Sequence, residues 1–183
     1  MRRRRYLRML GGLPVVAAGV SGCLSGSMSG PADRALTAEA IGETWTYSEG
    51  GSPVVTESGT VTASYRADEP YPQTVRLRLW PCEGETLEAL GGTCSLGNLP
   101  DQMRANESVS TANRSVGETA FLWWTDVVTD IEVVTANHVF RLTHTLLSET
   151  DSDTGRETPS RDDRIETVTR IARLQTDKID RVT

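Results

Sequence analysis

The sequence predicts a mainly β domain, either an antiparallel β-sandwich or a small barrel, with a C-terminal helix as a further option. From residue 43 onward, short runs rich in Val, Thr, Tyr and Trp are separated by Gly and Pro. Such runs at short intervals are typical of antiparallel strands joined by turns rather than of βαβ units. At 183 residues, the chain has material for one domain of ordinary size.

The clearest strand covers residues 74–80, where apolar and polar side chains alternate with a period of two. One face carries Val75, Leu77 and Leu79, and the other carries Arg76, Arg78 and Trp80. We also expect strands at residues 44–47, 54–56, 60–66, 131–135 and 137–148, and an aromatic-rich segment at residues 118–129.

The last segment, residues 163–183, fits two structures. Its apolar side chains fall within a half circle of a helix, and these are Ile165, Val168, Ile171, Ala172, Leu174, Ile179 and Val182. Ser160, three residues before Asp163, can cap such a helix. The segment is also rich in Thr, Ile and Val, so it can instead return along residues 137–148 as a hairpin arm. We favour the helix.

The first 23 residues have the layout of an export signal. Five arginines among residues 2–8 precede the uncharged run Met9–Gly22, which ends in small residues before Cys23. Within it, Arg3, Arg4, Tyr6 and Leu7 fit the twin-arginine pattern. We expect residues 1–22 to be a cleaved leader and the sulfur of Cys23 to carry a lipid, because a thiolate is the strongest nucleophile the chain offers.

Two alternatives to this interpretation are ordinary secretion after cleavage and retention of the segment as a membrane helix. The uncharged run of residues 9–22 would reach roughly 21 Å as a helix, which is short of the ~30 Å hydrocarbon core. One acyl chain binds a membrane only marginally, so stable anchoring needs a second chain or a protein partner.

The composition of the chain is unusual in its basic residues and in its net charge. Lys178 is the only lysine among 19 basic residues. Removing residues 1–22 takes away five arginines and no acid, which leaves 14 bases against 25 acids and a net charge of −11. The signal and this composition together resemble the twin-arginine lipoproteins of haloarchaea. The resemblance implies a halophilic protein anchored to the cell membrane and facing the exterior, and it lends no specific activity.

The acidic balance excludes one class of partner. Binding to nucleic acid needs a basic patch, so we expect no nucleic-acid partner. Acid clusters such as Glu83/Glu85/Glu88 lack the loop pattern of a calcium site and are interpreted as a solvated face.

Cys82 and Cys94 remain after Cys23 is assigned to lipid. In an oxidising compartment an even pair predicts a disulfide. A zinc site is the alternative, but two thiols without a nearby histidine supply too few ligands. We therefore predict no metal and no cofactor.

The predicted organisation has three parts: the leader at residues 1–22, a lipidated flexible tether at residues 23–42, and a single extracytoplasmic domain at residues 43–183. Residues 101–117 are polar and are interpreted as a surface loop. This loop holds two acceptor patterns for N-glycosylation, at Asn106 and Asn113.

Trp123 and Trp124 form the candidate binding surface. Neighbours on a strand point to opposite faces, so one indole is expected in the core and the other outside. The outer indole can stack on a sugar or dock a protein. Alternatively, it is covered by the loop at residues 101–117 or by the C-terminal segment. His138 and His144 are interpreted as ordinary strand histidines, since no nucleophile motif accompanies them.

The sequence therefore favours a non-enzymatic, membrane-anchored binding or structural module. Its expected partners are the membrane, through the lipid, and an envelope protein or carbohydrate. The alternative is a small extracellular hydrolase with acidic residues as general acid and base, recognisable by two carboxylates that face each other across a cleft. A third option is a subunit with no ligand of its own, recognisable by a flat, uncharged face.

Overall fold

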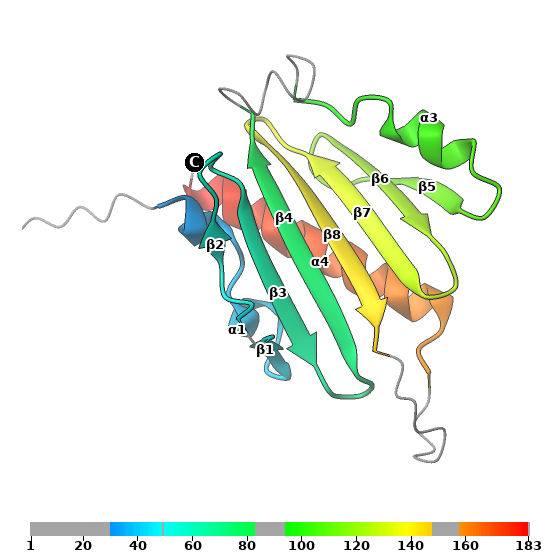
Figure 1. Ribbon diagram of the computed structural model, residues 1–183, viewed down its shortest axis with the longest axis horizontal. Helices are drawn as coiled ribbons and strands as arrows, with labels where there is room; N and C mark the ends of the chain where they lie inside the picture. The colour runs from blue at the N-terminus through cyan, green and yellow to red at the C-terminus, as the bar shows by residue number, and fades with distance from the viewer. Residues whose placement is uncertain (1–29, 49, 83–93, 148–157, 183) are drawn as a thin grey trace, which may run out of the picture.

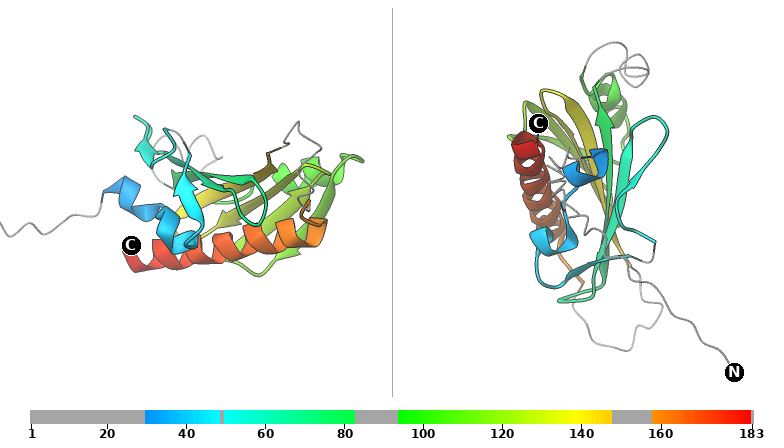
Figure 2. Two further views of the ribbon diagram at one scale, coloured as in Figure 1. Left: turned by 90° about the horizontal axis from the view of Figure 1, so that it is seen from below. Right: turned by 90° about the vertical axis from the view of Figure 1, so that its left-hand side faces the viewer.

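The computed structural model describes residues 30–48, 50–82, 94–147 and 158–182, and it consists of two layers (Figure 1). One layer is an antiparallel sheet of eight strands, and the other is the helix α4 (Arg161–Val182), which crosses one face of the sheet (Figure 2). The predicted mainly β antiparallel fold with a C-terminal helix is confirmed. The described strands do not close into a barrel, so of the two predicted architectures the β-sandwich is the one consistent with the structure.

The strands follow the order β1-β3-β4-β8-β7-β6-β5, and β2 also pairs with β3. The central pair, β4 and β8, joins segments far apart in the chain, with Leu77 opposite Leu142. The strands are β1 (Trp45–Tyr47), β2 (Val54–Val55), β3 (Val61–Ala67), β4 (Gln73–Pro81), β5 (Ser110–Arg114), β6 (Thr119–Trp124), β7 (Val128–Val134) and β8 (His138–Leu146).

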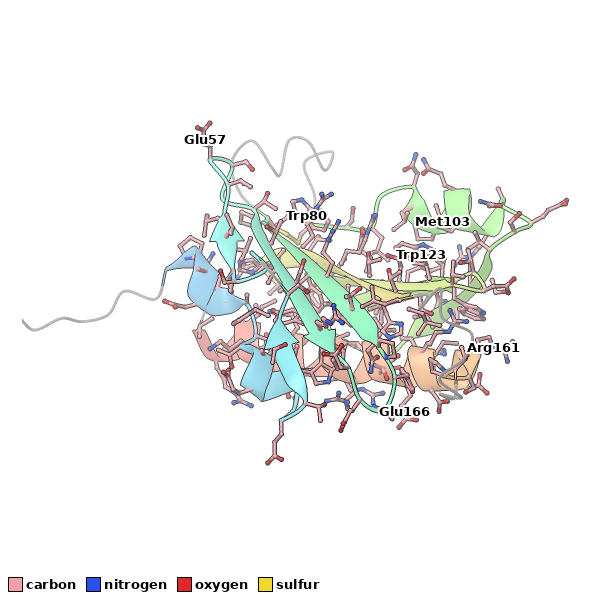
Figure 3. The ribbon with its side chains drawn as sticks, turned by 60° about the horizontal axis from the view of Figure 1, so that its bottom comes forward. Glu57, Trp80, Met103, Trp123, Arg161 and Glu166 are labelled. Atoms are coloured by element: carbon pink, nitrogen blue, oxygen red, sulfur yellow. A yellow bond between two sulfur atoms is a disulfide. The ribbon has the colours of Figure 1, made fainter. Side chains whose placement is uncertain are left out.

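Alternate residues of the strands point toward α4 and form the core. In one register row, Ala63, Leu77, Leu142, Ile131 and Leu122 lie side by side across five strands, and all are buried. From the helix, the buried side chains in the same core are Val168, Ile171, Ala172 and Ile179. Burying one Leu or Ile contributes about 1.5–3 kcal/mol, so this row holds the helix to the sheet. Figure 3 shows Trp80, Trp123 and Met103 on the opposite side of the sheet from α4.

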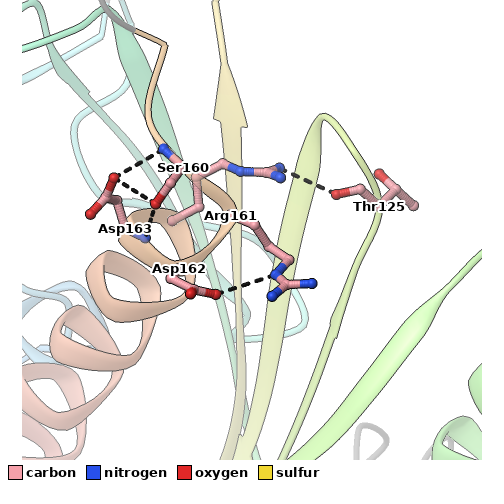
Figure 4. Close-up of polar contacts among 6 residues, drawn as sticks. Thr125, Ser160, Arg161, Asp162 and Asp163 are labelled. Atoms are coloured by element: carbon pink, nitrogen blue, oxygen red, sulfur yellow. Dashed lines mark hydrogen bonds and ion pairs between the residues drawn. The ribbon is translucent and has the colours of Figure 1, made fainter.

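A capping box stabilises the first turn of α4, the segment for which the sequence left a helix and a hairpin arm open. The Ser160 Oγ accepts the Asp163 N–H at 3.1 Å, and the Ser160 N–H donates to the Asp163 carboxylate at 2.9 Å (Figure 4). Each side chain thereby satisfies a backbone N–H that the first helical turn leaves without a partner. The favoured helix is confirmed, and it begins two residues before the predicted boundary.

The tether predicted at residues 23–42 is wrong over its second half. A 3₁₀ helix, η1 (Pro31–Arg34), and a short helix, α1 (Ala38–Ile41), belong to the domain, and Leu36 and Ile41 are part of its core. The four buried apolar residues between positions 35 and 41 are too few to give a periodic signal, which is why the sequence alone suggested a linker.

The surface loop predicted at residues 101–117 is also corrected. It contains most of a short helix, α3 (Leu99–Arg104), and all of β5. The strand is polar because it lies at the sheet edge and pairs only with β6 among the described strands, so it lacks the alternation of a half-buried strand. Asn106 is exposed in the turn after α3, and Asn113 is exposed on β5.

The predicted disulfide is present between Cys82, directly after β4, and Cys94, with Cα atoms 5.4 Å apart. The export-signal residues Arg3, Arg4, Tyr6 and Leu7 and the lipid-attachment residue Cys23 lie outside the described residues, as does the acidic cluster at residues 83–88. No helix in the described part of the chain is both long enough and apolar enough to span a bilayer.

Candidate binding face

The sheet has a second face, turned away from α4, which we call the open face. The open face is built from the strand residues that alternate with the core residues, and β4 contributes Thr74, Arg76, Arg78 and Trp80 to it. The neighbouring strands contribute Thr62, Ser64 and Arg66 from β3, Arg141 and Thr143 from β8, Asp130 and Glu132 from β7, and Phe121 and Trp123 from β6.

The β6 end of the open face is covered. The Arg104 guanidinium, at the end of α3, lies 5.2 Å from the centroid of the Phe121 ring. Trp123 stacks on Phe121 with centroids 5.9 Å apart, and the Arg141 guanidinium lies 5.2 Å from the Trp123 ring. As a result Trp123 is only 8% exposed.

Trp124 points to the other side of the sheet, where it packs against the core. The two neighbouring tryptophans therefore do lie on opposite faces, as strand geometry requires, but neither is an open platform. Among the described residues, β4 contributes the half-buried Trp80 to the open face, where its register neighbour Val139 is buried. The alternation at residues 74–80 contained this signal, since it placed Trp80 beside two arginines.

Two acids on β7 are engaged with β8. The Glu132 carboxylate accepts a hydrogen bond from Arg141 Nε at 2.7 Å and forms an ion pair with Arg141 Nη2 at 2.6 Å, and the Asp130 carboxylate accepts the Thr143 hydroxyl at 2.5 Å. Burial raises the pKa of both carboxyls, while Arg141 and Thr143 oppose the shift. Both acids are thus held by neighbours on the next strand.

Arg76 and Arg78 differ from the other arginines of the open face. Both side chains are exposed on β4, and neither guanidinium forms a hydrogen bond or an ion pair with any residue that the structure describes. Two strand positions apart, they lie roughly 6.6 Å from each other along β4. Their register neighbours are hydroxyls or a cation, since Arg76 lies between Ser64 and Thr143, and Arg78 lies between Thr62 and Arg141.

A hollow of about 360 Å³ opens beside Arg76. Its walls are rich in hydroxyls, and its lining residues are Ser48, Gly50, Gly51, Ser64, Thr74, Val75 and Arg76. The loop after β1 approaches β3 so closely here that a Cβ added at Gly51 would lie 2.6 Å from the Ser64 carbonyl oxygen. The open face therefore combines guanidinium groups, hydroxyls and one indole with a concave end.

The two histidines lie on the α4 side of the sheet. His144 is fully buried, and its Nε2 is 2.8 Å from the Gln73 Oε1. Burial and, to a smaller extent, the nearby Arg164 together lower the pKa of His144 to about 4. Within the described residues, no three His, Cys, Asp or Glu side chains come close enough to hold a metal ion.

A second hollow, of about 470 Å³, lies between α4 and Arg114 at the end of β5. Its charges offset one another, since Asp162 and Glu166 lie beside the arginines. Arg170 is also tied to the Ile41 carbonyl oxygen at 2.8 Å. The open face is therefore the stronger candidate for recognition.

Comparisons with protein-family models, with characterised proteins and with solved structures find no match for this chain.

Proposed function

We propose that this protein is a membrane-anchored extracytoplasmic lipoprotein that works as a binding module and presents the open face to its ligand. The twin-arginine pattern at residues 3–7 and the proposed lipid acceptor Cys23 support export and anchoring to the membrane. One structural observation carries the binding role. The sheet buries one face under α4, while the other face holds Arg76, Arg78 and Trp80 without an ion pair or hydrogen bond to the described residues.

The distance from the membrane follows from the chain between Cys23 and Pro31. Fully extended, this stretch spans at most roughly 30 Å. The domain, which begins with η1 rather than at residue 43, would therefore stay close to the surface of the envelope. Ligands within reach are molecules of that surface.

A second candidate, a small extracellular hydrolase, has one observation in its favour. Asp130 and Glu132 are neighbouring open-face carboxyls with raised pKa values, and such groups are frequent at catalytic sites. The two acids lie on one strand and are bonded to Thr143 and Arg141, whereas glycosidases place two carboxyls on either side of the substrate. The binding module is therefore preferred. Loss of a measured hydrolytic activity in both Asp130→Asn and Glu132→Gln would reverse that preference.

Lipid attachment and membrane anchoring are tested by mass spectrometry of the membrane fraction from cells that express the wild type, Cys23→Ser or Ser27→Ala. We expect the wild type and the Ser27→Ala control to have the mass of residues 23–183 plus lipid and to remain with the membrane. We expect Cys23→Ser to lose both the lipid mass and membrane retention. An unchanged mass and unchanged retention in Cys23→Ser would overturn the lipoprotein assignment.

A further inference from the structure

We propose that the ligand of the open face is an acidic polysaccharide, a glycan whose carboxylate or sulfate groups are bound by Arg76 and Arg78 while a sugar ring lies against Trp80. This inference rests on the proposed function and adds the class of ligand. It is argued from the charge of the face, from its side-chain chemistry and from the position of the apolar residues.

Charge is the first argument. The chain carries a net charge of −6 and becomes more acidic when the leader is removed, yet among the described residues the strands of the open face carry more guanidinium groups than carboxylates. Arg66 is paired with Asp68 at 2.8 Å, and Arg141 is paired with Glu132. Arg76 and Arg78 have no ion-pair partner among the described residues of an otherwise acidic protein, and this complementarity selects an anionic ligand.

Guanidinium geometry supports the same class. Each planar fork can bind a carboxylate or sulfate through two parallel hydrogen bonds, which a point charge cannot do. Because Arg76 and Arg78 point from the same side of one strand, they can hold successive anionic groups of a single extended chain.

The groups around the two arginines favour a sugar. The hydroxyls of Ser64 and Thr143 flank Arg76, and Thr62 lies next to Arg78, so donors and acceptors are available for sugar hydroxyls. Trp80 follows Arg78 on the same face, and an indole packs an apolar surface against a ring while its edge stays polar. Hydrogen bonds and stacking also persist in salt better than phosphate contacts to a nucleic acid.

The exposed apolar residues argue against a lipid surface. Among the described residues, the large apolar side chains most exposed are Val54, Val55 and Val127. The first two lie on β2, and Val127 lies in the turn between β6 and β7, at the other end of the sheet. A protein that lies on a membrane needs a continuous apolar surface to insert among the lipids, and these residues do not form one around Arg76 and Arg78.

The test uses the full mature lipoprotein reconstituted in detergent-free phosphatidylcholine nanodiscs, with binding measured by biolayer interferometry in molar salt and in dilute buffer. The probes are polygalacturonate, dextran sulfate, neutral dextran, phosphatidylglycerol vesicles and polyglutamate. We expect polygalacturonate or dextran sulfate to bind and neutral dextran not to bind. Arg76→Gln/Arg78→Gln removes two groups that form charge-assisted hydrogen bonds with an anion, so it should weaken binding at least about tenfold.

The matched control is Arg173→Gln/Arg181→Gln, which makes the same change of charge at two exposed arginines on α4 and should bind like the wild type. Circular dichroism checks that each variant is folded. Trp80→Ala should weaken polysaccharide binding and leave the selectivity for anionic probes intact.

The inference is overturned if neither acidic polysaccharide binds, or if the Arg76/Arg78 variant binds as tightly as the wild type. Vesicles or polyglutamate bound through Arg76 and Arg78, with no polysaccharide bound, would also overturn it while leaving a binding module on the open face. Failure of the lipid assignment at Cys23 is read separately, by mass, and does not alter these results.

Discussion

Gln175, in the middle of α4, holds Leu36 in place across 139 positions of the chain. The fully buried Gln175 side chain accepts the Leu36 N–H at 3.1 Å through Oε1 and donates to the Arg34 carbonyl oxygen at 2.7 Å through Nε2. The Leu36 carbonyl oxygen in turn accepts the hydroxyl of Tyr65, on β3, at 2.9 Å. The N-terminal segment is therefore bonded to both layers of the domain.

Gln175→Met should destabilise the domain by about 2–4 kcal/mol. The substitution nearly keeps the side-chain volume but removes the partner of the buried Leu36 N–H, at about 1–3 kcal/mol, and that of the partly buried Arg34 carbonyl, at less. The measurement is urea unfolding followed by circular dichroism. Lys178→Met, a more exposed position on the same helix, is the control and should change the free energy of unfolding by less than about 0.5 kcal/mol. Equal effects of the two substitutions would show that the bonds of Gln175 contribute nothing.

His144 should make the domain less stable in mild acid. Its folded pKa of about 4 is below the ordinary value of 6.5, so between these values the unfolded chain takes up a proton that the folded chain does not. The stability from neutral His144 is complete above pH 6.5, falls as the pH drops toward 4, and changes no further below that. The total loss is about 3 kcal/mol.

The groups facing His144 explain the direction of its pKa shift and supply the control. Gln73 on β4 binds its Nε2, and the guanidinium of Arg164, on α4, opposes a second positive charge. Urea unfolding at a series of pH values, with His144→Gln beside the wild type, checks the prediction. The variant should show a shallower fall between pH 6.5 and 4, and parallel curves would contradict the assignment.

Arg141 and Glu132 should be strongly coupled. The Glu132 side chain is only 9% exposed, so Arg141→Met leaves a nearly buried carboxylate without its cation and should cost about 2–4 kcal/mol. Adding Glu132→Gln to Arg141→Met should recover part of that loss, because the uncompensated charge is gone. A double-mutant cycle measures the coupling. Additive effects of the two substitutions would mean that the two side chains have no interaction energy with each other.

The strands that could be predicted are the ones with a buried face. On β4 the alternation of Leu77 and Leu79 with Arg76 and Arg78 was visible in the sequence, and the structure places the first pair in the core and the second pair on the open face. The strand β5 could not be found in the same way. Its residues Ser110–Arg114 lie at the edge of the sheet, and none of them is fully buried.

The candidate site could be predicted only in part. The sequence drew attention to Trp123 because two tryptophans adjoin, but it could not show that Arg141 and Phe121 cover that ring. Nor could it show that Glu132 pairs with Arg141 while Arg76 and Arg78 have no ion-pair partner in the described part of the chain, because these residues come from different strands. Pairing across a sheet depends on register, which local patterns do not contain.

Gly51 should tolerate a side chain less well than its neighbour Gly50. An added Cβ at Gly51 would lie 2.6 Å from the Ser64 carbonyl oxygen and 2.8 Å from that of Ser48, so Gly51→Ala must push the loop away from β3 and strain the Ser64 N–H bond to the Gly51 carbonyl. We expect a loss of about 1–3 kcal/mol in urea unfolding and weaker polysaccharide binding, because the hollow beside Arg76 changes shape.

Gly50→Ala is the matched control, since its Cβ meets nothing within 4 Å and only its positive φ of 64° opposes the change. That conformation costs roughly 1 kcal/mol, and Gly50→Ala, whose methyl group borders the hollow without meeting another atom, should weaken binding less than Gly51→Ala does. If Gly50→Ala weakens binding as much as Gly51→Ala does, the close approach to Ser64 does not shape the binding face.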